Sequence, residues 1–300
     1  MATHNNDDAH DIATAAVVVG VDGSAAADLA VRWAAETAAA RHRRLRIVTG
    51  LNFAATQAVT GTYDLMIPAV VEAIRSHGAE CVAAARDLAL SVDPTLTVET
   101  EVSEGNPARL LIEHSESAHL VVIGASSDGG TIRHLGSTLL AVASHGHGSI
   151  VVVRGTERAT GSAGPVVVGV DGGPVSEAAI GVAFAEASNR NADLVAVHVW
   201  SDLYFDTFGG TITDPAIHEH AQATLAEQLA GWQQKYPDVE VTREVYQSGP
   251  RHYLIEWSKT AQLLVVGSRG RGGFRGLLLG STSNALVQRA HCPVLVAHAD

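Results

Sequence analysis

Short apolar runs alternate with longer amphipathic segments along most of the chain. In the second half, five runs predict strands at 166–170, 194–199, 239–246, 263–267 and 294–298. Four of them are short and mostly apolar, as is typical of buried parallel strands. Between these strands, segments 176–189 and 214–235 carry apolar residues at helical spacing. Ser176 in this half, and Ser24 at the corresponding place in the first half, are suitable helix caps. This alternation predicts an α/β fold with a doubly wound, five-stranded parallel sheet covered by helices on both faces.

The same pattern occurs twice. AVVVGVDGS at 16–24 recurs as PVVVGVDGG at 165–173, and VETEVSEGNPARLLIE at 98–113 aligns with VTREVYQSGPRHYLIE at 241–256. The separation falls from 149 to 143 between these matches, which places about six extra residues of the first copy within 51–77. The ordered matches predict two related domains in tandem. We expect a disordered tail at 1–14, domains at 15–155 and 165–300, and a linker at 156–164.

Composition and charge narrow the function classes. No segment approaches the roughly 18 uninterrupted apolar residues of a membrane span. The net charge of -12 disfavours nucleic acid and anionic membranes as partners. The chain opens without a basic and apolar leader, and its two cysteines form no disulfide framework, so a cytoplasmic location is expected. Cys292, which precedes a proline and an apolar run, is expected to pack as a small apolar residue.

A glycine-spaced loop follows the strand predicted at 263–267. Gly267 is followed by two residues, Gly270, nine residues and Gly280, and then Ser281 and Thr282 open a helix. Glycines let backbone NH groups approach phosphate oxygens, and a helix N-terminus favours an anion. A flexible surface loop with glycine as filler is the alternative, but the preceding strand and following helix favour a phosphate site.

A carboxylate follows the first strand of each copy. In the second copy, Asp171 comes after Gly169 and Val170, at the edge where ligands of open parallel sheets bind. It could accept hydrogen bonds from an adenine amino group or a ribose hydroxyl, although a local turn explains an Asp there equally well. The main chain at Val199 offers groups to a base edge. His198 is expected to pack beside the sheet rather than to act in catalysis.

These motifs resemble the universal stress protein family, present here as a tandem pair. The resemblance rests on VVVGVDGS and VVVGVDGG, on GP before the penultimate helix, and on VVGSRGRGGFRGLLLGSTSNALVQRAHCPVLVAH near the end, and it covers about 15–299. It implies a Rossmann-like fold of the adenine nucleotide alpha hydrolase type, with strand order 3-2-1-4-5. It also implies ATP as the ligand, because ATP-binding members share the glycine spacing of the second copy. Mg²⁺ would arrive with the nucleotide.

The resemblance implies one site in each copy. The second site, which is preferred, comprises Gly169, Val170, Asp171, Val199, Gly267, Gly270, Gly280, Ser281 and Thr282. The first comprises Gly20, Val21, Asp22, Gly50, Gly124, Gly136, Ser137 and Thr138. In the first copy the third residue after Gly124 is Ser127, and eleven residues rather than twelve separate Gly124 from Gly136. Nucleotide binding by the first copy is therefore left open.

The sequence offers no secure catalytic group. There is no P-loop and no lysine in the glycine loop, so we expect a binding protein rather than an enzyme, with weak ATP hydrolysis as a side activity. Two histidine pairs, His145 with His147 and His218 with His220, lack companion ligands at zinc spacing and are expected to face solvent.

Three functions remain open on the sequence alone. The first is a nucleotide-binding stress regulator in which ATP occupancy sets conformation or affinity for an unknown protein partner. The second is an ATP-dependent enzyme, a slow ATPase or an adenylyl transferase, which the absence of an extra substrate domain disfavours. The third is an interaction module that has lost nucleotide binding, which the intact second loop disfavours. The resemblance also implies pairing of the two domains through their last strands, and a homodimer is a further expectation.

Overall fold

The computed structural model describes residues 15–53, 68–125, 136–154, 163–201, 215–270 and 279–299. The expected tail at 1–14, most of the linker at 156–164 and the middle parts of both glycine loops lie outside these residues. The chain divides into two compact units, Met1–Gly155 and Thr156–Asp300. Each unit has the alternating strands and helices that the hydrophobic pattern predicts.

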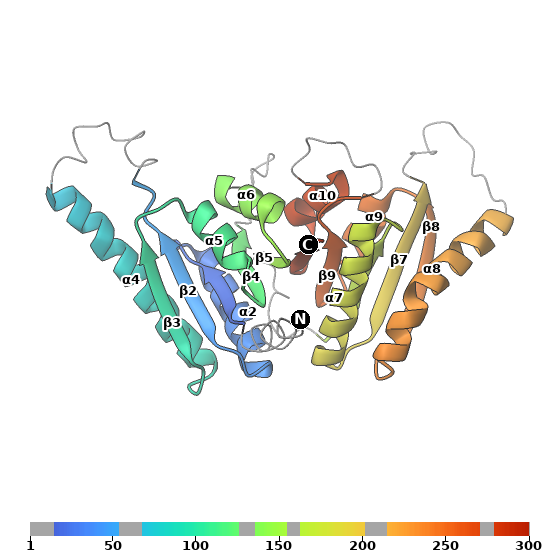
Figure 1. The fold of residues 1–300 in the computed structure, drawn as a ribbon, viewed down its shortest axis with the longest axis horizontal. Helices are drawn as coiled ribbons and strands as arrows, with labels where there is room; N and C mark the ends of the chain where they lie inside the picture. The colour runs from blue at the N-terminus through green and yellow to red at the C-terminus, as the bar shows by residue number, and fades with distance from the viewer. Residues whose placement is uncertain are drawn as a thin grey trace, which may run out of the picture. The chain divides into compact units, whose positions relative to one another are not determined.

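The first unit is a parallel sheet between two pairs of helices (Figure 1). Its strands pair in the order β3-β2-β1-β4-β5. Their bounds are β1 Val17–Gly20, β2 Leu45–Gly50, β3 Val98–Ser103, β4 Leu120–Ala125 and β5 Ser149–Arg154. The helices are α2 Ala25–Ala40, α4 Pro68–Val92, α5 Pro107–Ser115 and α6 Ser137–His145, with α2 packed on α4 and α5 on α6. Right-handed crossovers leave β1 in both directions, so the two helix pairs cover opposite faces.

The second unit repeats this arrangement. Its strands pair in the order β8-β7-β6-β9-β10, all parallel. Their bounds are β6 Val166–Val170, β7 Leu194–Ser201, β8 Val241–Ser248, β9 Leu263–Gly267 and β10 Val294–Ala297. The helices are α7 Pro174–Arg190, α8 Pro215–Lys235, α9 Pro250–Trp257 and α10 Ser281–Arg289. The predicted fold class and the strand order are confirmed in both units.

The central strands are buried on both faces. Every residue from Leu120 to Ile123 in β4 and from Leu263 to Val266 in β9 is at most 7% exposed. Helices cover both faces of these strands, so a polar side chain at any of these positions would be removed from water at a cost in free energy. This explains why the sequence shows continuous apolar runs there rather than strict alternation.

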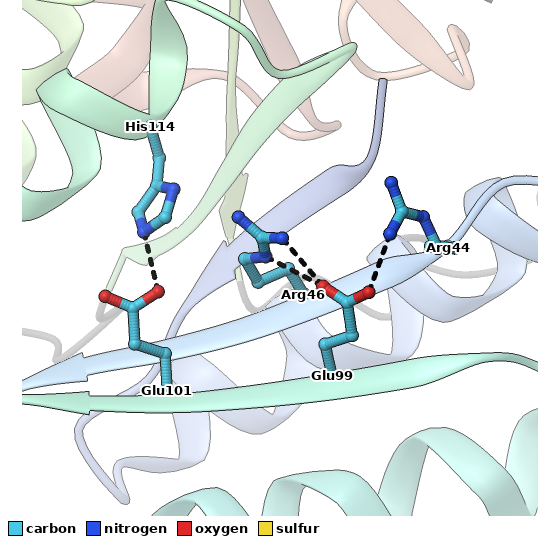
Figure 2. A network of polar contacts seen from close by, with 5 residues as sticks. All are labelled: Arg44, Arg46, Glu99, Glu101 and His114. Carbon is cyan, nitrogen blue, oxygen red and sulfur yellow. Dashed lines mark hydrogen bonds and ion pairs between the residues drawn. The ribbon is translucent and has the colours of Figure 1, made fainter. Parts of the chain in front are cut away.

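The edge strand β3 has a different pattern, with glutamates on one face. Glu99 accepts hydrogen bonds from Arg46 Nη2 at 2.7 Å and from Arg44 Nη1 at 2.8 Å (Figure 2). Glu101 follows two residues later on the same face of β3, and its Oε2 lies 3.0 Å from His114 Nε2 of α5 (Figure 2). The hydrogen bond from Arg46 is the main reason that the pKa of Glu99 lies below its usual value. These charged side chains are half-exposed on the edge strand of the sheet. Charge at this place disfavours pairing of the edge strand with another chain.

The two predicted helix caps have different outcomes. Ser24 is the N-cap of α2, and its Oγ accepts from the Ala27 NH at 3.2 Å, which confirms the prediction. The prediction for Ser176 is wrong, because α7 starts earlier, with Gly173 as the N-cap and Pro174 as the first helical residue. Proline suits that position because its fixed φ is helical and it needs no NH partner there. Ser176 instead accepts from the Asp171 NH at 3.1 Å and thereby ties the helix to the end of β6.

Candidate functional site

A cavity of about 400 Å³ opens at the carboxyl ends of the strands in the first unit. The ends of β1, β2, β4 and β5 form its floor, and the starts of α2, α5 and α6 form its walls. All eight predicted first-site residues line it: Gly20, Val21, Asp22, Gly50, Gly124, Gly136, Ser137 and Thr138. The volume lies within the range of small-molecule sites, about 300–1,000 Å³. The structure therefore assembles the first set of residues around a single space.

Three of these glycines allow close packing at the floor of the cavity. A Cβ on Gly50 would lie 2.7 Å from Pro107 Cα, and one on Gly20 would lie 2.8 Å from Leu111 Cδ1, so both admit α5. A Cβ on Gly124 would overlap the Ala26 carbonyl in the first turn of α2. These glycines let two helices approach the strand ends, a role that the sequence pattern did not reveal.

The N-terminus of α6 is the anion-attracting part of the cavity wall. Gly136 is its N-cap, and no described side chain caps the helix. Ser137 and Thr138 follow and line the cavity. The first NH groups of a helix lack intrahelical partners, and they carry the positive end of the helix dipole. By contrast, Ser24 caps α2, and its own NH donates to Asp22 Oδ1 at 3.0 Å. An anion in this cavity is therefore best placed beside α6.

The charged residues in the described part of the cavity lining are Asp22 and Arg154. Asp22 follows β1 and is exposed, whereas Arg154 is the last residue of β5 and is only 3% exposed. The sequence analysis missed Arg154, whose one signal is a cation that directly follows a buried apolar run. SIVVVRG at 149–155 aligns with PVLVAHA at 293–299, a separation of 144, so the matching residue of the second unit is His298.

In the second unit, the predicted carboxylate meets the predicted glycine loop. A Cβ on Gly270 would lie 2.7 Å from Asp171 Oδ2, while Asp171 Oδ1 accepts from the Gly173 NH at 2.8 Å. A Cβ on Gly267 would lie 2.9 Å from Val175 Cγ1, so this glycine admits α7 as Gly124 admits α2. Residues about one hundred positions apart in the sequence therefore share the carboxyl edge of the second sheet.

Gly280 holds the loop against the start of α10. Its NH donates to the Ser268 carbonyl at 2.8 Å, and an added Cβ would lie 3.3 Å from Arg269 Cα. No described side chain caps α10, so Ser281 and Thr282 present the first NH groups of the helix. Residues 271–278 of this loop lie outside the described part of the chain. The NH of Gly280 is used internally, so the NH groups that could meet an anion here are those of the two residues that follow it.

The remaining predicted residues of the second site lie at the ends of β6 and β7. Val170 and Val199 are buried, and a Cβ on Gly169 would lie 3.1 Å from Leu254 Cδ1 of α9. His198 is 5% exposed, and its Nδ1 donates to the Val170 carbonyl at 2.8 Å. His198 therefore packs beside the sheet, as expected, and joins the two strand ends.

Metal and thiol chemistry find little support in the part of the chain that the structure describes. No three His, Cys, Asp or Glu side chains among these residues are grouped as a metal site. Cys292 is 1% exposed, and burial raises the pKa of its thiol to about 12, which confirms its packing role. None of the described helices combines the length and apolar character needed to cross a membrane.

Comparisons with known proteins agree with this architecture. The sequence profile of the universal stress protein family matches residues 15–154 and 163–298. A universal stress protein of Mycolicibacterium smegmatis is 41% identical over 283 residues, covering 93% of this chain and 96% of that protein. One of Mycobacterium tuberculosis is 40% identical over 289 residues, covering 94% and 96%. The crystal structure of a universal stress protein from Archaeoglobus fulgidus, 17% identical, shares the fold with a TM-score of 0.69, covering 94% of this chain and 98% of that one. The chain therefore belongs to the universal stress protein family, as a member with two tandem domains.

Proposed function

We propose that this protein binds ATP in each of its two domains and acts as a regulator or sensor in the stress response. Nucleotide occupancy would control its conformation or its affinity for a protein partner. The observation that carries the proposal is the first-domain cavity, because every residue implied by the family resemblance lines it. This cavity also supports ATP binding in the domain whose glycine spacing departs from the pattern.

The lining of the cavity fits an adenine nucleotide. Apolar side chains, among them Val48, Leu110 and Ile123, offer a surface for a base. The Asp22 carboxylate can accept hydrogen bonds from ribose hydroxyls, and the uncapped start of α6 can hold phosphates. Mg²⁺ would add positive charge between the phosphates, and its ligands would be phosphate and water oxygens together with the Ser137 and Thr138 hydroxyls.

The same lining supports binding rather than turnover. Among the described residues of the lining, the titratable groups are Asp22 and Arg154, and none of these residues is a histidine, lysine or glutamate that could serve as a general base beside α6. Fast phosphoryl transfer needs a positioned nucleophile and several cationic groups around the transferring phosphate. We therefore propose a role in which ATP is held and exchanged.

In the second domain, the proximity of Asp171 to Gly270 supports the same mode of binding. The carboxylate and the loop occupy the carboxyl edge of the sheet, where open parallel sheets bind their ligands. The uncapped start of α10 corresponds to that of α6. We propose that each domain holds its nucleotide in the same orientation relative to its own sheet.

The direct test is calorimetric titration of the nucleotide-stripped full chain with MgATP. We expect two ATP per chain for the wild type, one for Gly136→Asp, one for Gly280→Asp and none for the double variant, with all four folded by circular dichroism. Because an added Cβ at Gly280 approaches Arg269 closely, Gly280→Ala is the matched control for packing alone. A wild-type chain that binds no ATP at millimolar concentration would contradict the proposal. Steady multiple-turnover release of ADP or AMP would favour an enzyme instead.

A further inference from the structure

We propose that Arg154 binds the terminal phosphates of the nucleotide in the first domain and makes this site selective for nucleoside polyphosphates over monophosphates. The inference rests on the proposed function of the first-domain cavity. It adds a specificity-determining residue that lies outside the glycine loop. It also assigns the two domains different preferences for ligand charge.

The position of Arg154 places it at the phosphate end of the cavity. It ends β5 and pairs in register with Ala125, the last residue of β4, after which the glycine loop of this domain begins. Ser137 and Thr138, which follow that loop, line the same cavity. A cation here extends the anion-attracting region formed by the start of α6.

Asp22 and Arg154, the charged residues of the described lining, give this part of the cavity a polarity that matches a nucleotide. Asp22 follows β1 and Arg154 ends β5, with β4 between these two strands. Neighbouring strands lie about 4.8 Å apart, so the two strand ends are separated by roughly 10 Å. A nucleotide whose ribose hydroxyls contact Asp22 would direct its phosphate chain across β4 towards Arg154. The α-phosphate alone would reach less far along this path than the β- and γ-phosphates.

The burial of Arg154 strengthens its expected effect on an anion. Its exposed fraction is 3%, so solvent screens its charge far less than that of a surface arginine. A guanidinium carries five NH donors in a planar fork that matches phosphate oxygens. It can therefore keep a contact with the protein and still donate to a phosphate. Charge-assisted hydrogen bonds of this kind are among the strongest in proteins.

The second domain provides a natural comparison. The residue at the matching repeat position is His298, which places an imidazole where the first domain has a guanidinium. The second domain has the regular glycine spacing, whereas the first domain has the shorter loop and the arginine. We infer that Arg154 supplies attraction for the terminal phosphates in the domain whose loop is one residue shorter.

The test measures charge discrimination at the first site alone, in a full chain that carries Gly280→Asp to remove the second. Dissociation constants for ATP, ADP and AMP are measured at pH 8 and fixed salt for Arg154, Arg154→His and Arg154→Gln. Histidine is the main variant because the repeat places His298 at this position of the same fold. Arg75→Gln, which removes a half-exposed arginine of α4 paired with Glu104, is the matched control.

We expect either substitution to lower the ratio of ATP to AMP affinity by about 10- to 100-fold, the loss of one or two charge-assisted hydrogen bonds. AMP affinity should change less than about threefold, and Arg75→Gln should leave the ratio unchanged. Two results with folded Arg154→His would overturn the proposal. Unchanged affinities for both ATP and AMP would show that Arg154 makes no contact with the nucleotide, and equal losses of both affinities would show that its role is structural. If the Gly280→Asp parent, which retains Arg154, binds no nucleotide, the proposed function of the first domain fails instead. The failure of that function and the failure of the Arg154 proposal are therefore distinguishable.

Discussion

Gly136→Asp should raise the stability of the nucleotide-free protein while removing ATP from the first domain. Gly136 is the N-cap of α6 with φ −55° and ψ 145°, a backbone conformation open to any residue. No described atom lies within 4 Å of a Cβ added there, so the side chain can be accommodated without displacement. The same change therefore has opposite effects on the free and the bound protein.

The stabilising effect follows from the missing cap. An Asp at the N-cap accepts hydrogen bonds from the NH groups of the first turn. It stabilises the helix by a few tenths of a kcal/mol more than glycine does at this position. Its charge at the positive end of the helix dipole adds about 0.3–1 kcal/mol. We expect about 1 kcal/mol in total, which for a unit of this size raises Tm by roughly 2–4 °C. The carboxylate also occupies the NH groups that we assign to phosphate and repels that phosphate, so ATP affinity should fall by on the order of 100-fold or more.

The assay is thermal unfolding with and without MgATP, in the Gly280→Asp background. At 100 times its dissociation constant, a ligand stabilises the protein to which it binds by about 2.7 kcal/mol. The parent should show a clear ATP-dependent rise in Tm, and Gly136→Asp should show a higher starting Tm with no rise. Gly136→Ala, which adds the Cβ without the charge, should retain most of the ATP-dependent rise. A Gly136→Asp protein that keeps the full rise would refute the placement of phosphate at α6.

Three further outcomes test the account of packing and charge. Glu99→Gln should lower stability by roughly 0.5 kcal/mol at pH 7. Because the folded-state pKa of Glu99 is lowered, its contribution is present above the usual value of 4.5 and is lost as pH falls below it, so the Tm values of the two proteins should converge in acid. Ellman's reagent at pH 8 should modify one thiol per folded chain and two after denaturation, because Cys81 is half-buried while Cys292 is 1% exposed with its pKa raised to about 12; two fast-reacting thiols in the native protein would contradict this. Gly181→Ala should cost about 1–3 kcal/mol in urea unfolding, since its Cβ would lie 2.5 Å from the tryptophan ring of α8. Gly231→Ala, with no described atom within 4 Å of the new Cβ, should instead stabilise α8 by up to ~1 kcal/mol, and equal effects of the two substitutions would refute the packing argument.

The fold could be predicted from sequence because burial on two faces leaves a strong local signal. The apolar runs at β1, β4, β6 and β9 are continuous for this reason, and the internal repeat doubled the information. Strand order is not a local property, and it came only with the family resemblance. The start of α7 was misplaced because the fixed φ of Pro174 set the boundary before the serine that resembled a cap.

The sites were only partly predictable, because some of their residues act through distant neighbours. The glycine spacing indicated a phosphate loop, yet Gly124 and Gly267 are also required by the approach of α2 and α7, which no local pattern reveals. Arg154 was missed because one charged residue at the end of a buried strand has no periodic signal. It can be recognised as a cavity residue only when β1, β4 and β5 bring it to the same space as Asp22.

If both domains hold ATP at the carboxyl ends of their strands, the chain should carry nucleotide through purification, and its nucleotide content can be measured. The full chain is purified without added nucleotide and denatured, and the released small molecules are identified and counted by chromatography and mass spectrometry. We predict adenine nucleotide approaching two molecules per chain, with Gly136→Asp and Gly280→Asp each reducing the count by one. Unchanged nucleotide content in the folded double variant, or no binding of ATP when it is added back to the wild type, would contradict the account.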